Sequence, residues 1–171
     1  MTSQIKYNTE TSYSLLKVFI GLMEGDELTY DYYHEVTGLS KTLYKEFLHN
    51  FKEMLLDLKL GRSLQMRKTK AENEKTVYYD CYYSLSPRKV DDYRFELPYD
   101  VDDNKKILYL PIITYLLLKN KHYVAYDTLA NFFPRFTNKT FHYLIEGLKN
   151  IIGEELYKDE FQCYVAEEDI E

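Results

Sequence analysis

The chain contains no tryptophan and only two cysteines among its 171 residues. Cys81 and Cys163 fall in different predicted segments, so we expect two free thiols that behave as small apolar side chains rather than a disulfide. Glycine and proline are also scarce, with 6 and 4 copies. A hydrophobic content of 45% with clear periodicity excludes a disordered chain.

Long apolar runs are missing as well. The longest, Ile107–Leu118, is interrupted by Pro111 and Thr114 and is too short to span a bilayer. It predicts a buried helix with Pro111 in its first turn. No charged-then-apolar signal segment opens the sequence, so we expect a cytoplasmic protein with no membrane partner.

Patterns typical of catalysis are absent too. The four histidines lie in separate segments, and none has a metal-ligand spacing to either cysteine. The sequence has no Gly-rich phosphate loop, no nucleophile elbow and no paired-carboxylate motif. We therefore expect a protein that is not an enzyme and that carries neither metal nor cofactor.

The most informative stretch of the chain runs from Leu28 to Met54. Thr29 is a predicted cap for a short helix that starts at Tyr30, and Gly38 supplies the left-handed residue that ends it. Ser40 can then cap a longer helix whose apolar side chains recur at three- and four-residue spacing. This pattern predicts a helix-turn-helix, in which one helix is presented outward. An ordinary helical hairpin with a solvated charged face is the alternative.

Further elements flank this motif on both sides. An upstream apolar stripe predicts another helix, capped by Thr11 or Ser12. Downstream, residues 77–85 alternate, which predicts a strand paired with residues 62–69 across a polar turn. Three helices followed by a hairpin constitute a winged helix-turn-helix. The predicted buried face of the closing strand consists of Val77, Tyr79, Cys81, Tyr83 and Leu85.

Residues 12–86 resemble the winged-helix domains of bacterial transcription regulators, particularly those of DeoR-like and WYL-type regulators. The resemblance lies in the Gly38-Leu39-Ser40 turn, the helix Thr42–Phe51 and the strand Tyr78–Leu85. The sequence departs from that family at His34, where a small residue usually packs the two helices together. The resemblance implies DNA binding, although winged helices also serve as protein-interaction modules.

Residues 123–165 repeat the same order of elements. Asp127–Phe133 is a predicted short helix, and Thr137 or Asn138 can cap a longer helix that ends at Gly153. A compact hairpin is predicted to follow, with residues 156–157 against 161–165. A C-terminal helical subdomain with coincidental similarity is the alternative.

We therefore predict an α+β, mainly helical fold made of tandem winged helix-turn-helix units. Residues 1–86 form the first unit and residues 107–171 form the second. An ordered linker, 87–106, joins them. Within it residues 93–97 alternate in a way that indicates an extra strand.

The net charge of −6 is the main objection to nucleic-acid binding, because Lys and Arg supply most of the affinity for phosphates. The charges are unevenly distributed, however. Residues 41–75 contain nine basic and five acidic side chains, whereas residues 87–171 contain eleven basic and sixteen acidic ones. The basic hairpin favours a DNA contact, with a merely solvated lysine-rich hairpin as the alternative. The acidic second unit is better suited to binding protein.

Under the DNA-binding hypothesis the predicted contacts fall into three sets. The first set would enter the major groove from the outward helix: Lys41, Thr42, Lys45 and His49. The second would contact phosphates or the minor groove from the hairpin: Arg62, Arg67, Lys68 and Lys70. The third set holds the equivalents in the second unit: Asn138, Lys139, Thr140 and His142. Glu46 and Glu53 share the exposed face of the first set and weaken it, because they repel phosphate.

Tyrosine is frequent, with 19 copies. Most are expected to fill half-buried faces, whereas Tyr78 and Tyr82 are predicted to point outward as anchors of a protein interface. The leading prediction is a transcription regulator whose partner is double-stranded DNA, acting as a homodimer or imitating one with its two units. The alternative is an adaptor that binds a protein partner, similar to the acidic tandem winged-helix subunits of chromosome-segregation complexes.

Overall fold

The computed structural model describes residues 2–72, 76–87 and 93–166. Its described part is mainly helical with two small sheets, which confirms the predicted α+β class. The chain divides into two compact units, residues 17–92 and residues 1–16 together with 93–171. The predicted first unit, 1–86, thus differs from the observed one chiefly by residues 1–16. Part of the predicted linker, residues 88–92, lies outside the described residues.

Helix α1 (Thr2–Met23) continues without interruption past Thr11 and Ser12, so neither residue caps it as predicted. Ser12 is 1% exposed, and its hydroxyl donates a hydrogen bond to the Ile107 carbonyl at 3.3 Å. In a regular helix that carbonyl would accept the N–H of residue 111, but Pro111 has no N–H. The serine therefore satisfies a carbonyl that the proline leaves without its helical partner.

In the unit of residues 17–92, the two helices of the predicted helix-turn-helix are α2 (Tyr30–Thr37) and α3 (Lys41–Asp57). Their caps are those predicted. The Thr29 hydroxyl accepts the N–H of Tyr32 at 3.1 Å, and Gly38 ends α2 with a φ of 72°. The Ser40 hydroxyl accepts the N–H of the third helical residue of α3 at 3.5 Å. Local chemistry thus sets both ends of the turn.

Aromatic rings fill the space between α2 and α3. The ring centroids of Tyr33 and Tyr44 are 4.9 Å apart, and so are those of Tyr33 and Phe47. His34 tilts outward and is exposed, and its Nδ1 donates a hydrogen bond to the Leu39 carbonyl at 2.9 Å. Tyrosine and phenylalanine rings therefore pack these two helices together.

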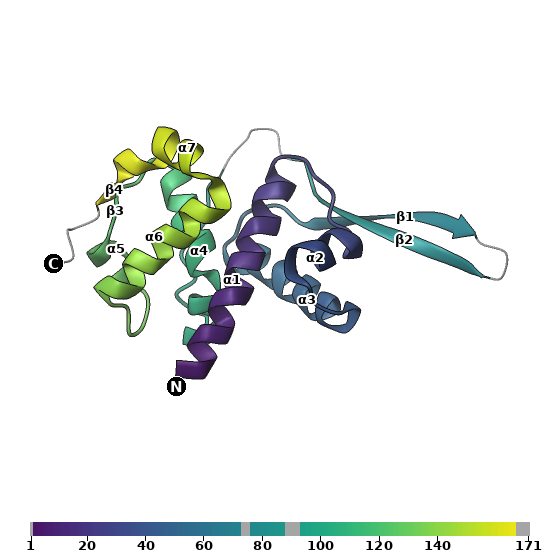
Figure 1. The fold of residues 1–171 in the computed structure, drawn as a ribbon, viewed down its shortest axis with the longest axis horizontal. Helices are drawn as coiled ribbons and strands as arrows, with labels where there is room; N and C mark the ends of the chain where they lie inside the picture. The colour runs from purple at the N-terminus through teal and green to yellow at the C-terminus, as the bar shows by residue number, and fades with distance from the viewer. Residues whose placement is uncertain (1, 73–75, 88–92, 167–171) are drawn as a thin grey trace. The chain divides into compact units, whose positions relative to one another are not determined.

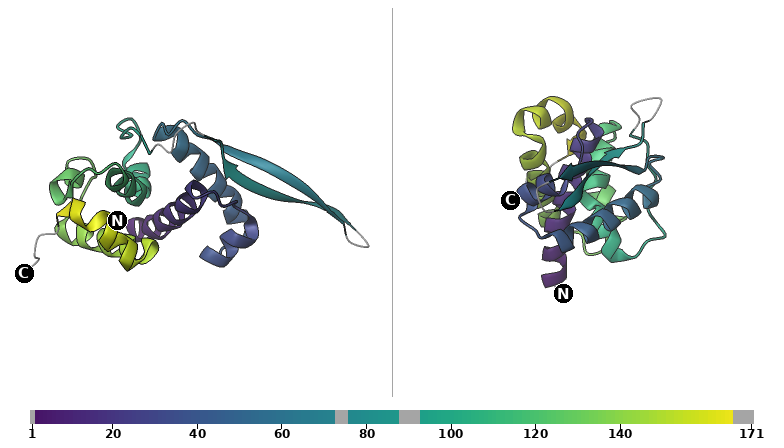
Figure 2. Two further views of the ribbon diagram at one scale, coloured as in Figure 1. Left: turned by 90° about the horizontal axis from the view of Figure 1, so that it is seen from above. Right: turned by 90° about the vertical axis from the view of Figure 1, so that its right-hand side faces the viewer.

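The hairpin consists of the antiparallel strands β1 (Leu64–Glu72) and β2 (Val77–Leu85). Its base is fixed by Leu28, whose N–H and carbonyl bond the carbonyl and N–H of Tyr83 at 2.7 and 2.9 Å. The outer half of the hairpin projects beyond α2 and α3 of its own unit (Figures 1 and 2). The predicted buried face is consequently buried only at Leu85, near the base, and Tyr79 is 60% exposed.

In the other unit, α4 (Asp103–Lys119) begins earlier than the apolar run that predicted it. The Asp102 carboxylate caps the helix by accepting the N–H of Lys105 at 2.9 Å, so Pro111 lies inside the helix and not in its first turn. No described helix is long and apolar enough to cross a bilayer.

Residues 93–97 form no strand, contrary to the prediction. Their side chains alternate between half-buried and exposed, but the backbone packs beside α4 instead of pairing with another strand. The Asn120 side chain donates to the Tyr93 carbonyl at 3.0 Å, and the Tyr93 ring lies 6.4 Å from that of Tyr115. Alternation alone therefore indicated a strand where no strand partner is available among the described residues.

The C-terminal half keeps two predicted helices, α5 (Tyr126–Ala130) and α6 (Asn138–Ile152). Thr137 caps α6 by accepting the N–H of Thr140 at 3.1 Å, and Gly153 follows the helix with a φ of 99°. Strand β3 (Val124–Ala125) precedes α5 and pairs in parallel with β4 (Val165–Ala166).

The predicted second hairpin does not form. Residues 154–164 instead form α7 (Glu154–Leu156), a π-helical turn η1 (Tyr157–Phe161) and a 3₁₀ turn η2 (Gln162–Tyr164), and Val165 belongs to β4. Tyr157 and Phe161 are both buried, and side chains four residues apart share one face of a helix. The exposed Cys163 therefore lies in a helical turn and not in a strand, whereas Cys81 lies in β2 as predicted. Both thiols are free, as predicted.

Within this unit, α1 and α6 approach closely at Gly147. A Cβ atom added there would lie 2.5 Å from the ring of Tyr13. The Tyr13 hydroxyl donates a long hydrogen bond of 3.5 Å to the Tyr143 carbonyl. Burial raises the pKa of Tyr13 to about 12.

Candidate nucleic-acid interface

The outward face of α3 carries two rows of opposite charge. Lys41, Lys45 and Lys52 follow one another four and seven residues apart, which places them along one line of the helix, and all three are exposed. We call them the lysine row. Glu46 and Glu53 lie along a neighbouring line. Thr42 and His49 lie between the two rows and are also exposed. The predicted first set is therefore accessible, and its positive side chains are separated from the acidic ones.

Lys41 occupies the first turn of α3, which contains no acidic residue. A cation at this end of a helix opposes the helix dipole at a cost of about 0.3–1 kcal/mol. The lysine therefore does not stabilise its own helix. A phosphate at the same place would interact favourably both with the lysine and with the dipole.

His49 does not stand alone in the position predicted for it. Its Nε2 lies 3.2 Å from Oε1 of Glu53, one turn further along α3. The imidazole is therefore directed toward the glutamate row and not toward the lysine row.

Strand alternation gives the hairpin two different faces. Met66, Lys68 and Lys70 of β1 are paired with Tyr83, Cys81 and Tyr79 of β2, so that these side chains share one face. We call its outer part, made of Met66, Lys68, Lys70, Val77 and Tyr79, the outer hairpin face. All five of these side chains are exposed. Asp80 is paired with Thr69 and lies on the opposite face.

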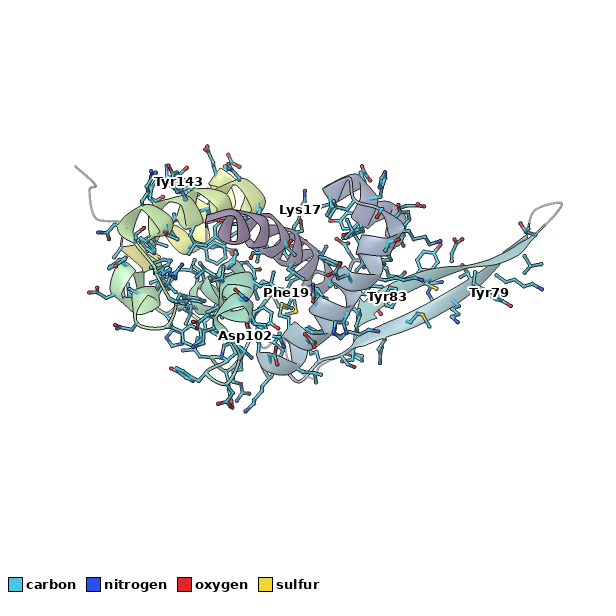
Figure 3. The ribbon with its side chains drawn as sticks, turned by 90° about the horizontal axis from the view of Figure 1, so that it is seen from below. Lys17, Phe19, Tyr79, Tyr83, Asp102 and Tyr143 are labelled. Carbon is cyan, nitrogen blue, oxygen red and sulfur yellow. The ribbon has the colours of Figure 1, made fainter. Side chains whose placement is uncertain are left out.

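Tyr83 connects the lysine row with this face of the hairpin. Its ring lies 6.0 Å from the Lys52 ammonium, near the base of β2, whereas Tyr79 lies further out on the same strand (Figure 3). Burial raises the pKa of Tyr44 on α3, and neighbouring Tyr83 and Cys81 raise it further. The side of β2 that contacts α3 is therefore the side on which Lys68 and Lys70 lie. Lys52 of the lysine row therefore lies on the side of the hairpin that carries Lys68 and Lys70, and we call the lysine row and these two lysines together the basic surface.

The two arginines predicted to contact phosphate are engaged elsewhere. Arg62 donates from Nε to the Ser86 carbonyl at 2.9 Å and from its guanidinium to the Met23 sulfur at 3.2 Å, which ties the base of the hairpin to α1. Arg67 donates to both carboxylate oxygens of Glu27, at 3.0 and 3.1 Å. In this arrangement neither guanidinium is directed toward the basic surface.

One of the two tyrosines predicted to anchor a protein interface, Tyr82, contacts an arginine of its own hairpin. The Arg67 guanidinium lies 4.3 Å from the centroid of the Tyr82 ring, which is half-buried. The side chain of Tyr78 lies outside the described residues. The more exposed aromatic ring of β2 is that of Tyr79, which the sequence pattern assigned to the buried face.

In the second unit the predicted set lies at the N-terminal end of α6. Asn138, Lys139 and His142 are exposed, and the Lys139 ammonium lies 5.8 Å from the Tyr143 ring. Thr140 is half-buried, and its hydroxyl is 2.9 Å from that of Thr137. Because the second hairpin is replaced by helical turns, these residues have no basic strand pair after their helix.

Sequence reasoning omitted Lys52 and Tyr79 from the site. Lys52 could have been included from its spacing with Lys41 and Lys45, which is a helical pattern. Tyr79 could not, because its exposure depends on how far the hairpin extends beyond the helices. In the described part of the chain, no group of three or more His, Cys, Asp or Glu side chains is placed to hold a metal ion. No protein-family model, curated protein or solved structure matches the chain.

Proposed function

We propose that residues 17–92 form a winged helix-turn-helix that binds double-stranded DNA, and that the protein acts as a transcription regulator. The observation that carries the proposal is the placement of the lysine row of α3 and of Lys68 and Lys70 on one side of the unit. In this class of protein the outward helix enters the major groove and neighbouring elements contact the backbone. The exposed N-terminal half of α3 and the hairpin suit these two roles.

The number of lysines sets the size of the expected effect. If the three lysines of the row and the two of the hairpin each neutralise one phosphate, log K falls with log salt at a slope of about −4.5. Affinity then decreases about 500-fold between about 50 and about 200 mM salt. The acidic residues elsewhere in the chain reduce affinity at low salt but do not abolish this dependence, since screening limits their reach to about 10 Å.

The proposal is tested by fluorescence anisotropy with a labelled random-sequence duplex at these two salt concentrations. The double variant Lys45→Gln/Lys68→Gln removes one lysine from each part of the surface. Lys158→Gln, at an exposed position in η1 of the other unit, is the matched control for loss of a lysine. We expect the double variant to lower both affinity and salt slope, and the control to change neither. Absence of salt-dependent binding by the unsubstituted protein would overturn the proposal.

A second candidate function is a protein-interaction adaptor. The observation that favours it is the exposure of large apolar side chains in the same unit, including Leu56 on α3 and Met66 and Val77 on the hairpin. Such side chains are suited to a protein interface. An adaptor is favoured if the duplex titration fails and these residues are protected in a complex with a protein partner.

A further inference from the structure

We infer that the outer hairpin face is a stacking platform for unpaired nucleobases, by which the protein binds single-stranded nucleic acid. This inference goes beyond the proposed function, because duplex binding by α3 and the hairpin lysines requires no exposed aromatic ring. Three features support it: the exposed ring of Tyr79, the lysines next to that ring, and the exposed bases and phosphates of an unpaired strand.

Tyr79 is 60% exposed on a hairpin that projects from its unit. Tyr83, four pairs nearer the base on the same face, is half-buried and lies by α3, as Figure 3 shows for both rings. The two tyrosines lie on the same face of the same strand, so they differ in exposure because of their position along the hairpin. Tyr79 contributes little to the core of its unit, and its exposed ring is open to a ligand.

Two lysines of β1 lie next to Tyr79 on this face. Lys70 is its direct partner across the strands, and Lys68 lies on the same face two pairs nearer the base. Both lysine side chains are exposed. The acidic side chain of β2, Asp80, is on the opposite face with Arg67, where Arg67 binds Glu27. Glu72 is paired with Val77 and therefore falls at a register position on the same face as Tyr79, so the paired positions next to Tyr79 hold two basic residues and one acidic residue.

An aromatic ring beside lysines is the combination that single-stranded nucleic acids require. The ammonium groups attract the phosphates, and the ring stacks on a base. In proteins that bind single strands this stacking adds to the affinity whatever the base sequence. In a duplex the ring faces of the bases are covered by their neighbours, so an intact duplex offers no stacking partner. An unpaired strand exposes ring faces and phosphates together. Charge complementarity thus favours a polyanion over a neutral peptide as the occupant.

The test uses three labelled ligands: oligo-dT of about 16 nucleotides, an abasic strand of the same length and charge, and a duplex. Tyr79→Ala removes the ring, and Tyr79→Phe keeps it without the hydroxyl. Tyr123→Ala is the matched control, because that ring is 73% exposed in the other unit. Circular dichroism of each variant confirms that the fold is retained.

We expect Tyr79→Ala to bind oligo-dT about tenfold more weakly than the unsubstituted protein, with Tyr79→Phe and Tyr123→Ala unchanged. The abasic strand should bind the unsubstituted protein and Tyr79→Ala equally. If Tyr79→Ala binds oligo-dT as tightly as the unsubstituted protein, or if oligo-dT does not bind, the platform is refuted.

The outcome for the platform is separate from that for the proposed function. Salt-dependent duplex binding without Tyr79-dependent binding of oligo-dT refutes the platform and leaves the regulator proposal standing. Tyr79-dependent binding of oligo-dT without duplex binding refutes the regulator proposal and leaves the platform standing. Failure with both ligands refutes both.

Discussion

Replacement of Lys45 by Ala should weaken duplex binding far more than replacement of its neighbour Glu46. Both side chains are exposed on α3, but Lys45 belongs to the lysine row and Glu46 to the glutamate row. One phosphate contact contributes about 0.9 to the slope of log K against log salt. At about 0.1 M salt this amounts to about eightfold in affinity, or ~1.2 kcal/mol.

The expected effect of Glu46→Ala is much smaller. If the nearest phosphate lies about 10 Å from the carboxylate, the unscreened repulsion in water is about 0.4 kcal/mol, and screening at about 0.1 M salt reduces it to about 0.2 kcal/mol. Affinity should then rise by less than about twofold. Alanine is a good helix former, so neither substitution should unfold α3.

Anisotropy titrations over a range of salt concentrations measure both quantities. The expected result is a slope that is smaller by about 0.9 for Lys45→Ala and unchanged for Glu46→Ala. Equal slopes for the two variants would show that the lysine row does not contact phosphate, whatever the absolute affinities.

Four further predictions concern single contacts. Glu27→Gln should leave the salt slope for duplex binding unchanged, because Arg67 lies on the hairpin face opposite Lys68 and Lys70, and an increase of about 0.9 would contradict this. Tyr44→Phe should raise the free energy of unfolding by about 1 kcal/mol in urea titrations, because the buried Tyr44 hydroxyl has no hydrogen-bond partner among the described residues. Gly147→Ala should lower that free energy by about 1 kcal/mol, because the added Cβ displaces the Tyr13 ring. In a Tyr13→Ala background the same substitution should raise the free energy of unfolding, because only helix propensity then acts. A change of the same sign in both backgrounds would refute the contact. Because burial raises the folded-state pKa of Tyr13 to about 12, its contribution is complete below the unfolded pKa and should be lost as pH rises from about 10 through about 12, with a smaller loss in Tyr13→Phe.

The parts of the fold that could be predicted from sequence are those set by neighbouring residues. Thr29, Gly38 and Ser40 determine the ends of α2 and α3 by hydrogen bonds and backbone conformation within a few residues. The same holds for Thr137 and Gly153 around α6. Each of these caps is where the sequence pattern placed it.

The errors concern elements whose state depends on distant partners. The hydroxyl of Ser12 is used by a carbonyl far along the chain, which a local capping rule cannot detect. Residues 154–164 contain Tyr157 and Phe161 four residues apart, a spacing that favours a helix. The hairpin is predicted there only by analogy with the first unit.

The candidate site shows the same division. The exposure of Lys41, Thr42 and Lys45 follows from the amphipathic pattern of α3, and it could be predicted. The engagement of Arg67 by Glu27 could not, because it depends on the Leu28–Tyr83 bridge that brings the loop before α2 beside the hairpin. A basic run in the sequence therefore does not reveal which of its charges remain available.

We propose that duplex DNA lies against the lysine row and the hairpin lysines of residues 17–92. Chemical acetylation of lysines, read by mass spectrometry with and without saturating duplex, measures this directly. We predict that duplex protects Lys41, Lys45, Lys52 and Lys68 and leaves Lys158 as reactive as before. If duplex protects none of the first four lysines, or protects Lys158 as strongly as them, DNA does not bind at this surface.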